Sequence, residues 1–200
     1  MSDLSSRLEP IKLNLGCGFK RIPGYINVDS VPDCQPDQVV NLELTPWPWA
    51  DNSVDEVQLI HVLEHLGREP QVFIGIMQQL YRVCRHGASV HVIVPHHRHD
   101  NFYSDPTHVR PVTPLGLSLF DKQLCESWVK SGYANTPLAL YCGVDFVTES
   151  VQHDIEERWL KRLNAGHISP EQLNDAMLHQ CNVITQSRFL LKVRKTESNL

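Results

Sequence analysis

The chain has 200 residues, a formal net charge of -5 and no run of lysine or arginine. This length suits one domain with a substantial core. A nucleic-acid-binding surface would show a basic stripe, so we expect no nucleic-acid partner. The start of the chain carries no long apolar segment, so we expect a cytoplasmic protein without a membrane partner. Six scattered cysteines without a C-x-x-C pair are typical of small buried residues in a reducing compartment.

The first two predicted strands, residues 11–15 and 25–29, flank a turn with Gly16 and Gly18. Two glycines let a ligand lie directly against the backbone, because no Cβ stands in the way. Asp29 ends the second strand, and a carboxylate there can accept both hydroxyls of a ribose. The pattern predicts a pocket for a nucleoside-containing cofactor at the carboxyl ends of parallel strands.

The spacing after the glycine turn argues against a dinucleotide. A dinucleotide fold has G-x-G-x-x-G running into a helix whose amino end holds a pyrophosphate. Here Arg21 occupies the third glycine position, and Pro23-Gly24 leaves no room for a long helix. A cofactor with a nucleoside but no phosphate fits better, and S-adenosylmethionine is the obvious one.

Strands and helices are predicted to alternate along the rest of the chain, with a loop at residues 45–52. Further strands are expected at 38–42, 54–60, 89–94, 138–148 and 183–194, and helices at 62–66, 70–86, 113–132, 151–164 and 169–180. This order predicts an α/β layered domain with a mostly parallel sheet.

Five motifs resemble, in order, those of class I S-adenosylmethionine-dependent methyltransferases. They are Leu13–Gly18, Pro23–Asp29, Asp51–Glu56, His61–His65 and Tyr81–Gly87, and Asp105–Arg110 resembles a segment of one small subgroup. The resemblance covers roughly residues 11–125. It implies a doubly wound, mostly parallel sheet of the Rossmann-like methyltransferase fold with seven strands, the last of them antiparallel.

The resemblance also implies how one domain, residues 1–200, is organised. Residues 11–94 would form the cofactor-binding half, and residues 95–132 the substrate loop and helix. Residues 151–180 would be a helical insertion before the last strand. S-adenosylmethionine would be the cofactor, and the chain would be a methyltransferase.

The glycine turn and Asp29 are the first candidate cofactor-binding residues. Gly16 and Gly18 would allow close approach of the methionine half of the cofactor, although a plain tight turn is the alternative. Asp29 would bind the ribose, with a cap before Ser30 as the alternative. Asn14 and Cys17 flank the turn, and Asn14 could reach the cofactor through water or serve the fold alone.

The ends of the third and fourth strands supply further candidates. Asn41 stands where the family usually has an aspartate that binds the adenine amino group, and Leu42 would lie against the adenine face. The alternative is that both merely end a strand. His61, just past the fourth strand, could contact cofactor or substrate. Glu64 is explained equally well by the positive end of a helix.

A histidine-rich segment follows the fifth strand. Residues 96–108 contain four histidines, His96, His97, His99 and His108, and two aspartates. They could form a metal site, an acid–base and substrate-binding loop, or a solvated loop. Zinc-type spacing is absent, so we expect no metal ligands.

The same segment supplies the expected catalytic and substrate-binding residues. His108 or Asp105 is the expected base, with His61 next. His97, His99 and Arg110 are expected to bind substrate, and Arg110 would position an anionic group.

The predicted activity is methyl transfer to oxygen or nitrogen of a small-molecule or sugar-containing acceptor. Two alternatives stay open: a cofactor-binding module without catalysis, and a metal-dependent enzyme that uses the loop at 96–108.

Overall fold

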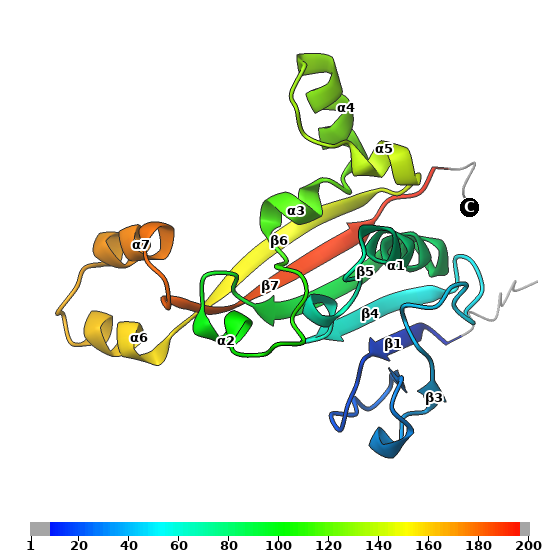
Figure 1. Cartoon of the computed structure of the whole chain (residues 1–200), viewed down its shortest axis with the longest axis horizontal. Coiled ribbons are helices and arrows are strands. Elements are labelled where there is room, and N and C mark those ends of the chain that lie inside the picture. The colour runs from blue at the N-terminus through cyan, green and yellow to red at the C-terminus, as the bar shows by residue number, and fades with distance from the viewer. Residues whose placement is uncertain (1–8, 197–200) are drawn as a thin grey trace, which may run out of the picture.

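The computed structural model of the chain describes residues 9–196. A single seven-stranded sheet runs through the molecule in the order β3-β2-β1-β4-β5-β7-β6 (Figure 1). Its strands are β1 (Ile11–Leu15), β2 (Ile26–Asp29), β3 (Gln38–Val39), β4 (Val54–Ile60), β5 (Cys84–Pro95), β6 (Phe146–Ile155) and β7 (Ile184–Val193). The first five strands are parallel, and β7 lies antiparallel between β5 and β6. The predicted mostly parallel, seven-stranded sheet with an antiparallel last strand is confirmed.

Short helices connect the strands after β4, and none of the described helices is long and apolar enough to cross a membrane. The helices are α1 (Pro70–Val83), α2 (Asp100–Tyr103), α3 (Pro114–Ser118), α4 (Lys122–Ser131), α5 (Leu138–Cys142), α6 (Glu157–Asn164) and α7 (Pro170–His179), with 3-10 turns η1 (Pro32–Cys34) and η2 (Leu63–His65). In α1, Pro70 starts the helix, and Phe73, Met77 and Leu80 recur on its buried face.

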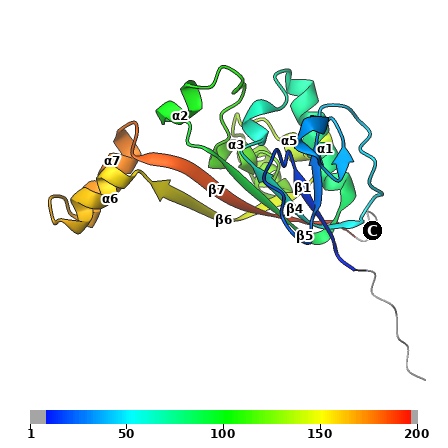
Figure 2. The same cartoon turned by 90° about the horizontal axis from the view of Figure 1, so that it is seen from below.

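The layering differs from the predicted doubly wound pattern, in which helices cover both faces of the sheet. Among the described residues, α1, α2 and α3 lie on one side of the sheet (Figure 2). The connections from β1 to β4 contain only η1, so they supply no α-helix to the other face. That face carries polar side chains. Among them, the Glu56 carboxylate forms an ion pair with Lys12 at 3.0 Å and accepts a hydrogen bond from the Tyr25 hydroxyl at 2.5 Å.

The region between α3 and β7 corrects three predicted elements. The strand predicted at 138–148 begins as helix α5 and becomes β6 only at Phe146. The helix predicted from residue 151 starts at Glu157, because β6 pairs with β7 as far as Ile155. The helix predicted at 113–132 is split, since the Asp121 side chain caps α4 by accepting the Leu124 N–H.

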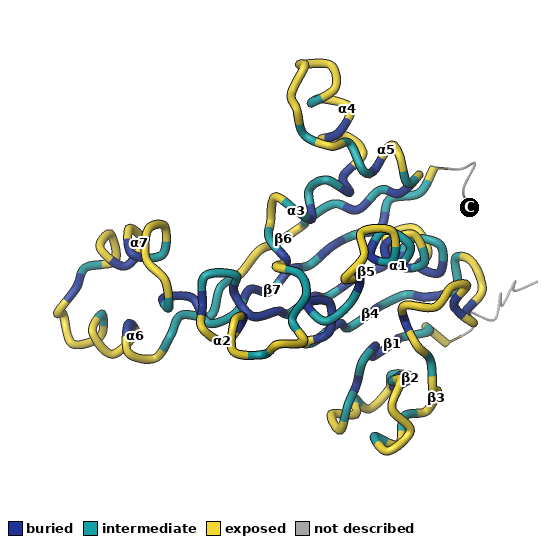
Figure 3. Tube along the Cα trace, viewed as in Figure 1, coloured by how far each residue is buried: buried dark blue, intermediate teal, exposed yellow. Residues whose placement is uncertain are grey.

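The buried residues form two clusters (Figure 3). The main core lies between the sheet and α1 and includes Leu13, Leu59, Val92 and Phe189. The second cluster belongs to α6 and α7, which follow β6 and precede β7, and centres on Trp159. The helical pair thus has a small core of its own, away from the strand ends that form the site.

Three of the six free cysteines, Cys17, Cys84 and Cys125, are buried, as expected for small core residues. Burial raises the pKa of the Cys84 thiol to about 12. Cys181 is exposed, so the prediction of burial does not extend to it.

Candidate functional site

The turn after β1 has the backbone that its glycines allow. Gly16 and Gly18 both have positive φ angles, 66° and 49°. A Cβ on Gly16 would lie 2.5 Å from Cγ2 of Val62, so only glycine fits there. The end of β1 therefore lies directly against the segment that follows β4.

The Asp29 carboxylate holds this turn and also faces open space. Its Oδ2 accepts the Gly18 N–H at 2.8 Å, and its Oδ1 accepts the Val31 N–H at 2.9 Å. Each carboxylate oxygen has a further lone pair for a ligand. The capping role and the ribose-binding role predicted for Asp29 are therefore compatible.

A cavity of about 270 Å³ opens at the carboxyl ends of β1, β2 and β4. The strand order reverses between β1 and β4, and ligands of open α/β sheets bind at such a point. The cavity brings together five of the residues predicted to bind a cofactor: Gly16, Asp29, Asn41, Leu42 and His61. Its other lining residues are Ser30, Val40, Val62, His65 and Leu66.

Three other predicted cofactor residues, Asn14, Cys17 and Gly18, do not line the cavity. The Asn14 amide donates to the Lys20 carbonyl at 3.0 Å and to Asn27 Oδ1 at 2.9 Å, which is a structural role. The Cys17 thiol is buried and donates to the Gly18 carbonyl. These residues therefore contribute to the fold of the turn and not to the wall of the cavity.

Hydrogen bonds to the backbone also fix Asn41 and His61, the residues that follow β3 and β4. Asn41 is exposed, and its Oδ1 accepts the Glu43 N–H at 2.9 Å, which leaves its amide hydrogens for a ligand. His61 has a positive φ of 56° and donates its N–H to the Ile93 carbonyl at 2.8 Å. A non-glycine residue with this backbone is uncommon, and such residues gather at functional sites.

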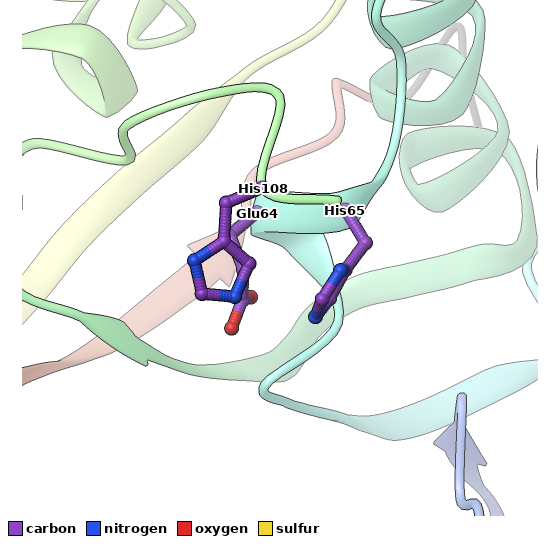
Figure 4. Close-up of side chains that lie close together, drawn as sticks. All are labelled: Glu64, His65 and His108. Atoms are coloured by element: carbon purple, nitrogen blue, oxygen red, sulfur yellow. The ribbon is translucent and has the colours of Figure 1, made fainter. Parts of the chain in front are cut away.

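Three side chains from two segments meet beside the cavity: Glu64 and His65 of η2, and His108 of the loop after α2 (Figure 4). The Glu64 carbonyl accepts the N–H groups of Val109 and Arg110 at 2.8 and 3.3 Å, and these bonds hold the loop that carries His108 against η2. The ligand atoms of the three side chains lie within 4.8 Å of one another. Sequence spacing did not predict this cluster, because backbone bonds between distant segments create it.

The tautomers of both imidazoles in the cluster follow from their hydrogen bonds. Nδ1 of His108 lies 2.7 Å from the Phe102 carbonyl, which can only accept, so Nδ1 carries the proton. Nδ1 of His65 lies 2.9 Å from the Thr107 hydroxyl, which donates to Asp105 Oδ1 at 2.6 Å and therefore accepts from His65. In the neutral imidazoles, each Nε2 then has a lone pair that can accept a proton or bind a ligand.

Asp105, one of the expected bases, is not hydrogen-bonded to His108. Its Oδ2 lies 3.9 Å from Nε2 of His108, beyond hydrogen-bond distance. Its Oδ1 accepts the Thr107 hydroxyl and N–H, and these bonds lower the pKa of the Asp105 carboxyl. Asp105 thus acts on His65 through Thr107.

The histidines of residues 96–108 do not converge on one point. His96 packs against His97 and His153, with ring centroids 4.3 and 5.7 Å away. His99 caps α2, where its Nδ1 accepts the Asn101 N–H at 3.0 Å. Only His108 reaches the cluster with Glu64, so the four histidines cannot share one metal ion in this arrangement.

Arg110 faces a second, apolar cavity of about 240 Å³. Its guanidinium lies 4.3 Å from the centre of the Phe73 ring and donates to the Gly67 carbonyl at 2.6 Å. Burial lowers the pKa of Arg110, and its Nε is buried without a hydrogen-bond partner. The predicted anion-binding arginine thus borders this second cavity and does not line the cavity beside Asp29.

Comparison with models of protein families and with curated proteins finds no match to this chain. Solved structures do resemble it. An S-adenosylmethionine-dependent methyltransferase from Archaeoglobus fulgidus matches with a TM-score of 0.57 and 19% identity, over 92% of this chain and 86% of the other. Another from Methanosarcina mazei matches with a TM-score of 0.54 and 13% identity, over 94% and 95%.

A third similar structure is a 16S rRNA adenine methyltransferase from Catenulisporales acidiphilia, with a TM-score of 0.50 and 13% identity over 94% of this chain and 87% of the other. At these identities the likeness concerns the fold. The chain has the Rossmann-like fold of S-adenosylmethionine-dependent methyltransferases, as the motifs predicted.

Proposed function

We propose that the chain is an S-adenosylmethionine-dependent methyltransferase that binds its cofactor in the cavity beside Asp29. The observation that carries this proposal is the position of that cavity. It lies at the switch point of a methyltransferase-like sheet, with a glycine turn on one wall and a carboxylate at the tip of the neighbouring strand.

The walls of the cavity suit the parts of this cofactor. Asp29 would accept the ribose hydroxyls with its remaining lone pairs. Asn41 would bind the edge of the adenine and Leu42 its face. The turn at Gly16 leaves room for the methionine part, because no side chain projects from it.

When bound, the cofactor supplies an activated methyl group on a sulfonium. The chemistry that the cofactor would supply is transfer of this methyl group to an acceptor oxygen or nitrogen, with the electron pair of the broken sulfur–carbon bond left on sulfur. The protein aligns the acceptor, excludes water and takes up a proton where the acceptor is a hydroxyl.

The imidazoles beside the cavity are the proposed proton acceptors. His61 and His65 line the cavity, and the His108 ring packs against that of His65, with ring centroids 4.6 Å apart. Of the predicted bases, His108 and His61 are better placed than Asp105, whose bonds to Thr107 occupy it.

A small-molecule or sugar-containing acceptor remains our proposal for the substrate. The formal charge of -5 disfavours a nucleic-acid substrate, although one protein of similar fold methylates rRNA. His97 and Arg110 are proposed to contact the acceptor, whereas the capping bond of His99 supports a structural role.

A binding series at Asp29 tests the proposed site. Asp29→Ala should weaken S-adenosylhomocysteine binding by roughly 1.5–3 kcal/mol, the scale of a charge-assisted hydrogen bond. Asp29→Asn should lose less, because its amide oxygen still accepts from Gly18. Asp33→Ala removes an exposed carboxylate of η1 and should bind as the wild type does. Equal affinities for all four proteins, measured by calorimetry, would exclude this cavity.

A further inference from the structure

Glu64 is a buried carboxylate without a hydrogen-bond partner. The residue is 0% exposed, and neither carboxylate oxygen has a hydrogen bond within the described chain. The nearest ionisable group is Nδ1 of His61, 3.5 Å from Oε1. Burying an unpaired charge is costly, so buried carboxylates are normally paired or bound to a metal. A cation bound beside Glu64 would supply the partner that its two carboxylate oxygens lack.

The two neighbouring imidazoles turn their free nitrogens toward this carboxylate. Nδ1 of His65 and Nδ1 of His108 both donate to outer partners, the Thr107 hydroxyl and the Phe102 carbonyl. Metal-binding histidines are oriented in the same way, since the second ring nitrogen donates to a carbonyl, carboxylate or similar group. The chain Asp105–Thr107–His65 is a support of this kind.

We propose that Glu64, His65 and His108 bind one divalent metal ion, through the Glu64 carboxylate and the Nε2 atoms of the two histidines. Their ligand atoms lie within 4.8 Å of one another, so a small contraction would bring each to the usual distance of about 2.0–2.2 Å from the ion.

The ligand types select the class of ion. Two imidazoles and one carboxylate suit first-row transition metals such as manganese, iron, cobalt and zinc, whereas magnesium and calcium prefer oxygen ligands throughout. Three protein ligands leave coordination positions open. Because His65 also lines the cavity beside Asp29, the open positions face that cavity.

The metal site lies beside the proposed cofactor cavity, so its effect on the acceptor rests on the proposed function. An acceptor hydroxyl bound to the ion would lose its proton to solvent or to His61 more readily, as metal-bound water does. The acceptor atom would then be oxygen. This role for His108 excludes its service as a direct base, because the same Nε2 lone pair would bind the ion.

Metal titration of the tag-free, metal-stripped full chain tests the proposal. We expect Co²⁺ and Zn²⁺ to bind at one site per chain, and Co²⁺ to give an absorption spectrum of nitrogen and oxygen ligation. Glu64→Gln should weaken binding at least about a hundredfold, since loss of even an outer partner costs about 10–100-fold. His179→Ala removes an exposed imidazole at the end of α7 and should bind as the wild type does.

Melting temperatures give a second measurement. Glu64→Gln should raise that of the metal-free protein, because it removes a buried charge, and should abolish the increase that Co²⁺ gives the wild type. His65→Ala offers a variant outside the main core, should Glu64→Gln fail to fold, and it too should lose the Co²⁺ increase. Equal Co²⁺ affinity in the wild type and in these variants would overturn the proposal.

The two proposals fail separately. S-adenosylhomocysteine binding is measured on the same samples with and without Co²⁺. Cofactor binding without a metal site refutes only the metal proposal, and a metal site without cofactor binding refutes only the methyltransferase.

Discussion

At Gly16 the backbone has a φ of 66°, and the side chain of Val62 fills the space where a Cβ would lie. Gly18, two residues on, also has a positive φ but faces open space. The two glycines therefore have different structural roles, although they belong to the same sequence motif. Gly16 lets the end of β1 approach the segment after β4, and Gly18 donates its N–H to Asp29.

This difference predicts unequal effects of alanine. A positive φ costs a residue with a Cβ about 1–2 kcal/mol, which applies to both sites. At Gly16 the clash with Val62 should add about 1–3 kcal/mol. Denaturant unfolding should show Gly16→Ala to be clearly less stable than Gly18→Ala. Equal losses would mean that Val62 moves aside freely.

The sequence predicted the walls of the cavity better than the cluster beside it. Gly16 and Asp29 follow directly after apolar strands, so their place at one edge of a parallel sheet could be deduced. Glu64 read equally well as a residue at a helix start, yet its side chain is buried in η2. His108 reaches it only because the N–H groups of Val109 and Arg110 bond the Glu64 carbonyl, and no periodicity reports such a bond.

At the scale of the elements, the helices α6 and α7 are the part of the fold most separate from the main core. It joins β6 to β7, has its own small core around Trp159, and contributes no residue to the cavity beside Asp29. It does support the histidine-rich loop, since Arg98 donates to the carbonyls of Met177 and Leu178.

Replacing residues 157–182 by Asn-Gly should therefore leave the cofactor site intact. Ile155 already pairs with Ile184, and a two-residue turn of this type closes antiparallel strands. S-adenosylhomocysteine affinity should be unchanged, while hydrogen exchange should become faster at residues 96–100, which lose their support. Loss of cofactor binding in a folded variant would show that the pair contributes to the site.

Helices and strands were predicted correctly where one sequence signal dominated. β4 has the predicted bounds, Val54–Ile60, and lies between β1 and β5 in the sheet. Residues 138–142 and 151–155 were misassigned, since Leu138–Cys142 is too short to show helical periodicity and the apolar residues of β6 recur at intervals that also suit a helix. Pairing with β7 makes these residues of β6 a strand, and the local sequence does not reveal this pairing.

Across the whole molecule, the buried imidazoles make stability depend on pH. Burial, followed by the neighbouring His97 and His153, lowers the pKa of His96 to about 4. The unfolded chain, with a histidine pKa of about 6.5, then binds more protons than the folded chain between about pH 4 and 6.5. Stability should consequently be complete above pH 6.5 and should fall as the pH drops through this range.

Urea unfolding at a series of pH values measures the effect. Each such imidazole contributes a slope of about 1.4 kcal/mol per pH unit within its range. His96→Asn keeps an acceptor for the Arg98 N–H and should reduce the slope. His179→Asn, at an exposed site, should leave it as it is. A wild-type stability that stays constant from pH 7 to 4.5 would contradict the burial of neutral His96.

Calorimetric titration of the full-length wild type with S-adenosylhomocysteine tests the central proposal most directly. A cavity built from the glycine turn, Asp29, Asn41 and Leu42 should bind one molecule per chain, with saturable heat and a rise in melting temperature that grows with ligand concentration. Absence of both heat and a melting shift at millimolar ligand would contradict cofactor binding, and the proposed methyltransferase would fail with it.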